Sequence, residues 1–131
     1  DLTKAESLPD SAFDCFVCTQ TLNFIFDAKS AVAGAAGLLK PGGVLLGTVS
    51  GISQISRYDM DRWGDYWRFT DLSVRKLLEP CFRSAEVQTC GNALAASAFL
   101  QGLAVEDLPD RSLLEERDHD YQLLIAFKAV K

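Results

Sequence analysis

The 131-residue sequence is poor in several features that would each point to a particular kind of protein. It carries 13 lysines and arginines against 18 aspartates and glutamates, a net charge of −5. Nonspecific nucleic-acid binding needs clustered cations, so we do not expect it here. No apolar run approaches the ~20 residues of a membrane-spanning helix, and the polar start shows no signal peptide. We therefore expect one globular unit in the cytoplasm, without a membrane span.

Cysteine and histidine are too few and too scattered to predict a metal centre or a disulfide framework. Cys15 and Cys18 form a C-x-x-C, but residues three apart in a strand point to opposite faces. We expect these two, together with Cys81 and Cys90, to be reduced and buried, which fits a cytoplasmic protein. His119, the single histidine, lies among acidic residues and is expected at the surface, with a general-base role as the alternative.

The first half of the sequence predicts a strand–helix–strand unit. Phe13 to Cys18 is a short apolar strand, and Asp27 is a plausible cap for a helix through Leu39. Pro41-Gly42-Gly43 cannot continue that helix, because proline lacks the amide hydrogen and glycine readily adopts positive φ. The nearly unbroken apolar run Val44 to Val49 then predicts a second strand. We expect both strands of this unit to be buried.

The second half continues with alternating helices and strands. The region from Ser50 to Phe69 has no clear period, and long irregular segments of this kind tend to be functional. After it we expect a helix capped by Thr70, a strand, a helix capped by Asn92, and a partly helical acidic loop. A long buried strand follows. These elements cover 70–81, 85–90, 92–103, 107–120 and 121–130.

Four short motifs occur in a fixed order: Asp1-Leu2, Leu8-Pro9, Phe13-Asp14 and Leu39-Lys40-Pro41-Gly42-Gly43. Together they resemble the second half of a class I S-adenosylmethionine-dependent methyltransferase of type 11. The resemblance implies a partial Rossmann-like α/β fold, comprising strands four to seven with their flanking helices. In that family the last strand inserts antiparallel beside the fifth. The family's glycine-rich loop is absent, so we expect residues 1–131 to form a single partial methyltransferase domain.

The resemblance also implies a binding site for S-adenosylmethionine. Asp1 matches the acidic residue that accepts a hydrogen bond from the adenine amino group, and Leu2 matches its neighbour. Three residues match the segment that borders the methionine part of the cofactor, and a fourth would pack nearby: Cys18, Thr19, Gln20 and Leu22. In the alternative interpretation, Thr19 merely ends a strand and Asp1 is a solvated residue.

The aromatic segment from Tyr58 to Thr70 is the candidate for acceptor binding, because aromatic rings beside carboxylates suit a sugar or a planar molecule. The string Y-W-R-F-T at its end resembles methyltransferases of cell-surface glycan synthesis. The predicted acceptor-binding residues are Tyr58, Trp63, Tyr66, Trp67 and Arg68.

An alternative is that Trp67 and Phe69 anchor the loop onto the core and that Arg68 is stacked or ion-paired, which leaves Trp63 and Tyr66 for the acceptor. No catalytic residue is assigned, since an activated methyl donor needs mainly positioning. A base would come from Asp59, Asp61 or Asp65.

Two function classes follow. The chain is the acceptor-side part of a methyltransferase for a small molecule or glycan, or it is an inactive fragment that self-associates. Without a neighbour, the strand at 13–18 would expose an apolar edge, so we expect a homo-oligomer. A separate upstream segment that completes the domain is a third possibility.

A nicotinamide-dependent dehydrogenase is disfavoured by the K-P-G-G turn. A nucleic-acid methyltransferase is disfavoured because Cys18 to Thr21 shows no N/D-P-P-Y motif.

Overall fold

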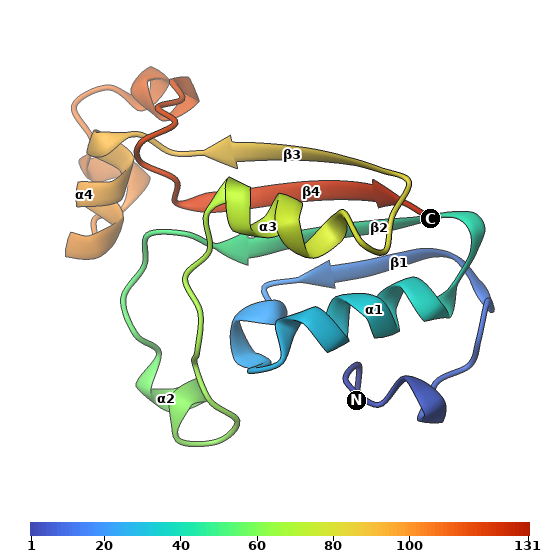
Figure 1. Cartoon of the computed structure of the whole chain (residues 1–131). Helices are drawn as coiled ribbons and strands as arrows, with labels where there is room; N and C mark the ends of the chain where they lie inside the picture. Colours follow the sequence, from blue (N-terminus) through green and yellow to red (C-terminus); the bar gives the residue numbers. More distant parts are fainter.

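The computed structural model describes residues 1–131 and shows a four-stranded sheet with two helices on one face (Figure 1). The strands are β1 (Phe13–Thr19), β2 (Leu39–Ser50), β3 (Ser84–Cys90) and β4 (Leu124–Val130). The helices are α1 (Ala28–Leu38), α2 (Arg57–Met60), α3 (Asp71–Leu78) and α4 (Ala93–Gln101). Four short 3-10 turns are η1 (Ala5–Ser7), η2 (Leu22–Phe24), η3 (Val105–Asp107) and η4 (Arg111–Glu115). No helix is long and apolar enough to cross a membrane.

The strand order is β1-β2-β4-β3, so the last strand of the sequence lies inside the sheet. β1 and β2 are parallel, as a strand–helix–strand unit requires, and β4 runs antiparallel to both of its neighbours. Val44 of β2 pairs with Val130 of β4, and Val130 in turn pairs with Ser84 of β3. The expected antiparallel insertion beside the second strand of the unit is confirmed.

The three longer helices begin at the residues that the sequence indicates. Asp27 accepts a hydrogen bond from the Ser30 amide at 3.0 Å, and Asn92 caps α4 in the same way. Thr70 and Ser73 form a reciprocal capping box at the start of α3. α4 ends at Gly102, whose φ of 71° lies in the left-handed region that favours glycine.

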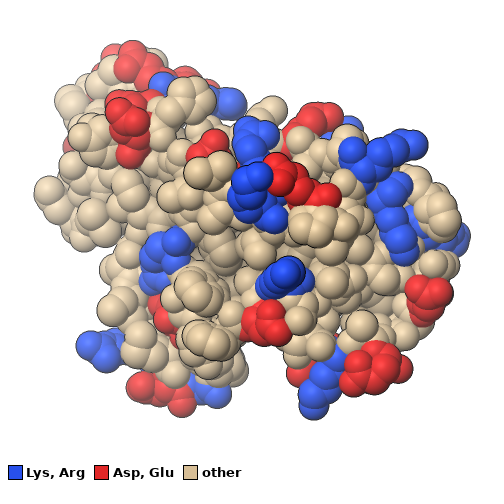
Figure 2. Space-filling view, viewed as in Figure 1, with Lys and Arg blue, Asp and Glu red and all other residues tan.

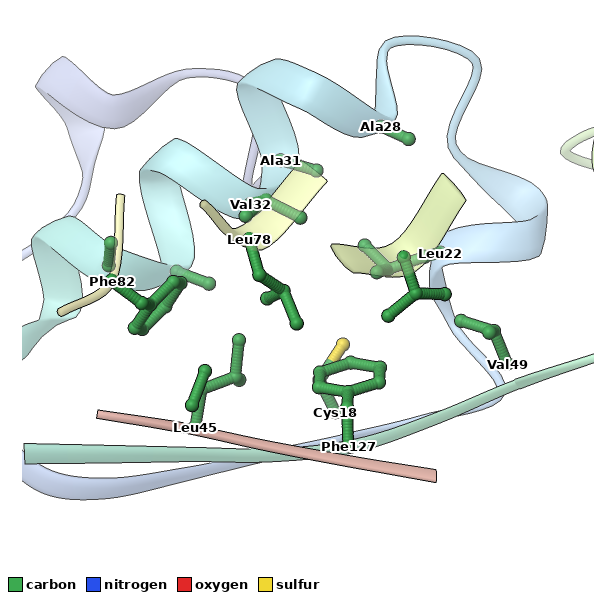
Figure 3. Close-up of a cluster of buried hydrophobic side chains, with 14 of the residues drawn as sticks. Cys18, Leu22, Ala28, Ala31, Val32, Leu45, Val49, Leu78, Phe82 and Phe127 are labelled. Carbon is green, nitrogen blue, oxygen red and sulfur yellow. The ribbon is translucent and has the colours of Figure 1, made fainter. Parts of the chain in front are cut away.

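The core lies between the sheet and the pair α1–α3 (Figure 3). Figure 3 shows Leu45 and Phe127 rising from the strands toward Val32 of α1 and Leu78 of α3. Cys18 is the one residue of β1 that is buried in this layer. All five residues are at most 5% exposed, so folding removes nearly all of their apolar area from water.

Gly47 in β2 makes room for the Phe127 ring in this core. A Cβ atom at Gly47 would lie 2.3 Å from Cζ of Phe127 and 2.7 Å from the Cys18 carbonyl oxygen. The ring therefore lies directly over the glycine backbone. This close approach requires a residue without a side chain.

β1 departs from the prediction that both strands of the unit are buried. Phe13, Cys15 and Val17 are exposed, Val17 by 60%, and the expectation of a buried Cys15 is wrong. The reason is positional: β1 is an edge strand, and α1 and α3 cover only one face of the sheet. The side chains that alternate to the other face, including Leu46 of β2, remain in solvent.

The boundaries of two strands also differ from the prediction. The K-P-G-G segment belongs to β2 rather than to a separate turn, because the Gly42 amide and the Gly43 carbonyl are both bonded to Lys131. β4 begins at Leu124 instead of Tyr121, and its burial alternates, with Lys128 exposed. β4 is therefore central in the sheet but covered on one face only.

Candidate functional site

The carboxyl ends of β1 and β2 meet at one edge of the sheet, where a polar cluster joins them. Gln20 follows β1 with φ of 49°, which is uncommon for a residue with a side chain. Its side-chain amide donates to Thr48 Oγ1 at 3.3 Å, and its Oε1 accepts from Ser50 Oγ at 2.6 Å. Its backbone amide donates to the Thr48 carbonyl at 2.8 Å. This edge is where ligands bind in open α/β sheets.

Asn23 connects this edge to the aromatic segment. Its side chain is 2% exposed; Oδ1 accepts from the Ser50 amide at 3.4 Å, and Nδ2 donates to the Trp67 carbonyl at 3.5 Å. Its backbone carbonyl accepts from the Tyr66 and Trp67 amides at 3.0 and 3.3 Å. A buried amide must be satisfied in this way. Asn23 therefore fixes the position of the aromatic segment relative to both strands.

Arg68 holds together the base of the aromatic segment. Its guanidinium pairs with Asp65 at 2.6 Å and also donates to the carbonyls of Ser53, Gln54 and Trp67. The Asp65 side chain is 2% exposed, and the hydrogen bond from Arg68 holds the pKa of its carboxyl below the usual value. Of the two alternatives for Arg68, stacked or ion-paired, the structure shows the ion pair.

Trp67 and Phe69 anchor the segment, as the alternative interpretation states. The Trp67 indole donates from Nε1 to the carbonyls of Ile25 and Phe26 at 3.1 and 3.2 Å, and its ring stacks on Phe26. Phe69 is 8% exposed and lies in the core cluster. The rings of Tyr66 and Phe26 form a T-shaped pair, with their centroids 5.4 Å apart.

The tip of the segment projects away from the sheet (Figure 1). There Tyr58 and Trp63 are 63% and 55% exposed, and their rings meet edge to face at 6.3 Å. The Arg62 guanidinium lies 3.5 Å from the Tyr58 ring centroid, within range of a cation–π contact. Residues 60–66 border a pocket of about 520 Å³ here. The structure thus divides the five predicted acceptor residues between an anchored base and an exposed tip.

The candidate bases differ in their surroundings. Asp65 is engaged by Arg68 and by the Ser56 amide, so it is a poor proton acceptor. Asp59 accepts from Ser56 Oγ at 2.6 Å, and Asp61 is exposed. His119, in the 91–123 connection, is exposed as expected, and its Nδ1 lies 3.3 Å from Oγ1 of Thr89 in β3.

The residues predicted to hold the cofactor lie in two places. Thr19 is exposed at the carboxyl end of β1, next to the Gln20 cluster, and Cys18 and Leu22 are buried in the core. Burial raises the pKa of the Cys18 thiol, which therefore stays neutral. The side chains of Cys18 and Leu22 can shape this edge through packing, while Thr19 and the turn at Gln20 are accessible to a ligand.

Asp1 and Leu2 lie beside α1. The Asp1 carboxylate accepts from the amide and the hydroxyl of Thr3 at 3.0 and 2.9 Å. Leu2 packs against the core, and its carbonyl oxygen lies so close to Gly34 that a Cβ atom there would be 2.0 Å away. No hydrogen bond joins these two residues to the cluster at Gln20.

Asn23 and Gln122 are site residues that the sequence reasoning missed. Gln122 Nε2 donates to Asp71 Oδ1 and to the His119 carbonyl, both at 3.0 Å, which joins α3 to the 91–123 connection. The signal for Asn23 was a single amide within the apolar run from Leu22 to Phe26. An isolated amide of this kind needs hydrogen-bond partners when it is buried.

Comparison with known proteins identifies this architecture. Residues 1–47 match the family model described as a methyltransferase domain. No curated protein matches the chain. Haemonchus contortus phosphoethanolamine N-methyltransferase 2 in complex with S-adenosyl-L-methionine is 17% identical, with a TM-score of 0.64. The match covers 100% of this chain and 36% of that one.

Two prokaryotic structures are similar to the same extent. A Thermotoga maritima SAM-dependent methyltransferase, described as a possible histamine N-methyltransferase, is 18% identical with a TM-score of 0.61. That match covers 97% of this chain and 61% of that one. A SAM-dependent methyltransferase from Archaeoglobus fulgidus is 12% identical with a TM-score of 0.60, and the match covers 100% and 65%.

These matches confirm the resemblance to a class I methyltransferase domain and the partial Rossmann-like fold. The chain spans about a third of the length of the Haemonchus enzyme and under two thirds of the other two. At these identities the structural likeness shows the fold alone.

Proposed function

We propose that this chain is the acceptor-side part of a methyltransferase that transfers a methyl group from S-adenosylmethionine to a small molecule or glycan. The observation that carries the proposal is the polar turn at Gln20 and Ser50, at the carboxyl ends of two parallel strands, with an aromatic segment tied to it through Asn23. The match of residues 1–47 to a methyltransferase domain supports it.

Residues in two places would hold the cofactor. Thr19 and the turn at Gln20 would border its methionine part at this edge, and Asp1 and Leu2, beside α1, would meet the adenine. The cofactor supplies an activated methyl group when bound, so the protein's own task is to orient the acceptor and exclude water. The exposed rings of Tyr58, Trp63 and Tyr66 offer flat surfaces for that acceptor.

The proposal is tested by calorimetric titration of the chain with S-adenosylmethionine and S-adenosylhomocysteine. Micromolar binding supports it and justifies a screen of acceptors. Absence of binding up to millimolar ligand contradicts it for this chain.

The variant Thr19→Lys sharpens the test, because the added ammonium repels the positive sulfonium of S-adenosylmethionine. S-adenosylhomocysteine has a neutral sulfur at the same place. We expect this variant to weaken donor binding more than product binding. Gln88→Lys, an equal change on an exposed residue of β3, should alter neither.

A second candidate function is self-association without catalysis, and the exposure of β1 favours it. β1 pairs only with β2, and Val17 and Phe13 are 60% and 46% exposed. The other edge strand, β3, presents Glu86 and Gln88 instead. Apolar edge strands tend to pair with further chains, whereas charged ones resist pairing.

Sedimentation velocity tests this candidate. We expect a dimer or larger species, which Val17→Lys should convert to a monomer, while Gln88→Lys should leave it unchanged. A monodisperse monomer of the unmodified chain at high concentration would contradict self-association.

A further inference from the structure

A pocket of about 570 Å³ lies between the first turn of α1, residues 73–77 of α3 and the segment 67–70. Its volume falls within the range of small-molecule sites. No lining residue comes from the carboxyl end of β1 or from Ser50, so the pocket is separate from the cluster at Gln20. We call it the interhelical pocket. The lining residues that matter are Phe26, Lys29, Trp67, Phe69, Lys76 and Leu77.

One wall of the interhelical pocket is aromatic, and its Trp67 ring is held in place by hydrogen bonds. The rings of Phe26 and Trp67 stack with centroids 5.7 Å apart and planes 24° apart. The two hydrogen bonds from Trp67 Nε1 fix its ring, and the packing of Phe69 in the core fixes the inner surface. Binding a flat apolar group against this wall therefore orders few additional side chains.

Cations at the pocket are available to a ligand. Lys29 forms no salt bridge, and Lys76 pairs at 2.9 Å with Glu79, where both side chains are more than half exposed. Exposed pairs of this kind contribute little and exchange readily. Arg68 is already engaged by Asp65, and the Asp27 carboxylate caps α1. Figure 2 shows Lys and Arg side chains on the face that α1 and α3 cover, with Asp and Glu side chains beside them.

The charge of the interhelical pocket lining differs in sign from the net charge of the whole chain. The net charge of the whole sequence is −5, but the pocket lining contains three cations and one carboxylate. Both helices begin at the pocket, so their first-turn amides add positive potential to that of Lys29 and Lys76. An apolar wall beside the unpaired Lys29 ammonium and the exposed Lys76–Glu79 pair suits a ligand with an apolar body and an acidic group.

We propose that the interhelical pocket binds a small amphipathic anion, distinct from the methyl acceptor and independent of the proposed methyl transfer. Its planar apolar body lies against Phe26, Trp67 and Leu77. Its acidic group reaches Lys29 and Lys76.

The test is an NMR titration of the ¹⁵N-labelled chain with naphthalene-2-carboxylate and with its neutral amide. The chain has two tryptophans, and Trp63→Phe assigns the indole signal of Trp67. We expect the carboxylate to shift the Trp67 indole signal saturably and to bind more tightly than the amide. Lys29→Gln combined with Lys76→Gln should weaken carboxylate binding by about threefold to tenfold and leave amide binding unchanged.

The matched control combines Lys40→Gln with Lys128→Gln. These two lysines also form exposed ion pairs, with Asp14 and Glu86, but on the strands. The control should bind both probes as the unmodified chain does. The proposal is overturned if Trp67 shows no saturable shift up to the solubility limit, if acid and amide bind equally, or if both double variants weaken the carboxylate alike.

Discussion

Replacing Gly47 by alanine should destabilise the sheet, because the new methyl group would meet the Phe127 ring. The Cβ atom would lie 2.3 Å from Phe127 Cζ, about 1.1 Å short of the 3.4 Å at which ordinary contact begins. The ring is 4% exposed, and the Cys18 carbonyl, 2.7 Å from the same position, blocks a simple shift of the strand.

The magnitude follows from two opposed effects. Overpacking of a well-packed core costs about 1–3 kcal/mol, and replacing glycine in a strand recovers roughly 0.5–1 kcal/mol. At the middle of both ranges, we therefore expect Gly47→Ala to lower the free energy of unfolding by about 1 kcal/mol. Urea unfolding followed by tryptophan fluorescence measures this, with an unchanged m-value if the native fold is retained.

Two further variants isolate the cause. Gly37 lies in α1, and a Cβ atom there meets nothing within 4 Å, so Gly37→Ala should stabilise by up to about 1 kcal/mol. In a Phe127→Leu background, Gly47→Ala should cost at least about 1 kcal/mol less than in the native background, as coupled neighbours do. If Gly47→Ala is neutral, or costs the same in both backgrounds, the reasoning about the ring is refuted.

Three other predictions concern separate parts of the molecule. Asp65→Asn should lower the free energy of unfolding by roughly 1–3 kcal/mol at neutral pH, because it removes the charged partner of Arg68. The pKa of Asp65 is lower in the folded than in the unfolded protein, so its contribution to stability is present above the unfolded pKa of about 4 and is lost as the pH falls below it. Urea titrations at several pH values should therefore show that Asp65→Asn loses less stability on acidification than the unmodified chain. Asn92→Ala removes the cap of α4 and the hydrogen bonds to two carbonyls of the 111–116 segment, so amide exchange in α4 should accelerate while the strands keep their protection. Cys15 is exposed and Cys18 is buried with a raised pKa, so mass spectrometry should find Cys15 alkylated in the native state and Cys18 only on unfolding; equal rates would contradict this placement.

Short sequence patterns predicted the starts of the helices well, because the capping residues act on amides only a few positions away. Asp27, Thr70 and Asn92 each cap the helix that follows them, because their side chains satisfy amides that no helical carbonyl reaches. The apolar period of α1 is confirmed by the burial of Val32 and Ala35. The strand order, by contrast, came from the family resemblance.

The failures arise where the outcome depends on distant residues. The apolar composition of β1 indicates burial, but Val17 is exposed because no helix covers its face of the sheet. The hydrogen bonds of Asn23 could not be predicted from neighbouring residues, since its partner Trp67 lies 44 positions away in the sequence. Trp67 and Tyr58 share one aromatic segment, yet contacts with the carbonyls of Ile25 and Phe26 turn Trp67 inward while Tyr58 stays in solvent.

The position of β4 has a consequence for the order in which the molecule can be assembled during synthesis. β2 and β3 are not neighbours in the final sheet, because β4 separates them. A ribosome completes β4 after the other three strands, so β3 has no native partner until then. Val44 of β2 can pair with β4 only after Val130, 86 positions later, has been synthesised. Pairing between residues so far apart in the sequence slows folding. A nascent chain stalled before Leu124 would therefore hold a two-stranded ribbon and a loose strand, a species suited to capture by a chaperone.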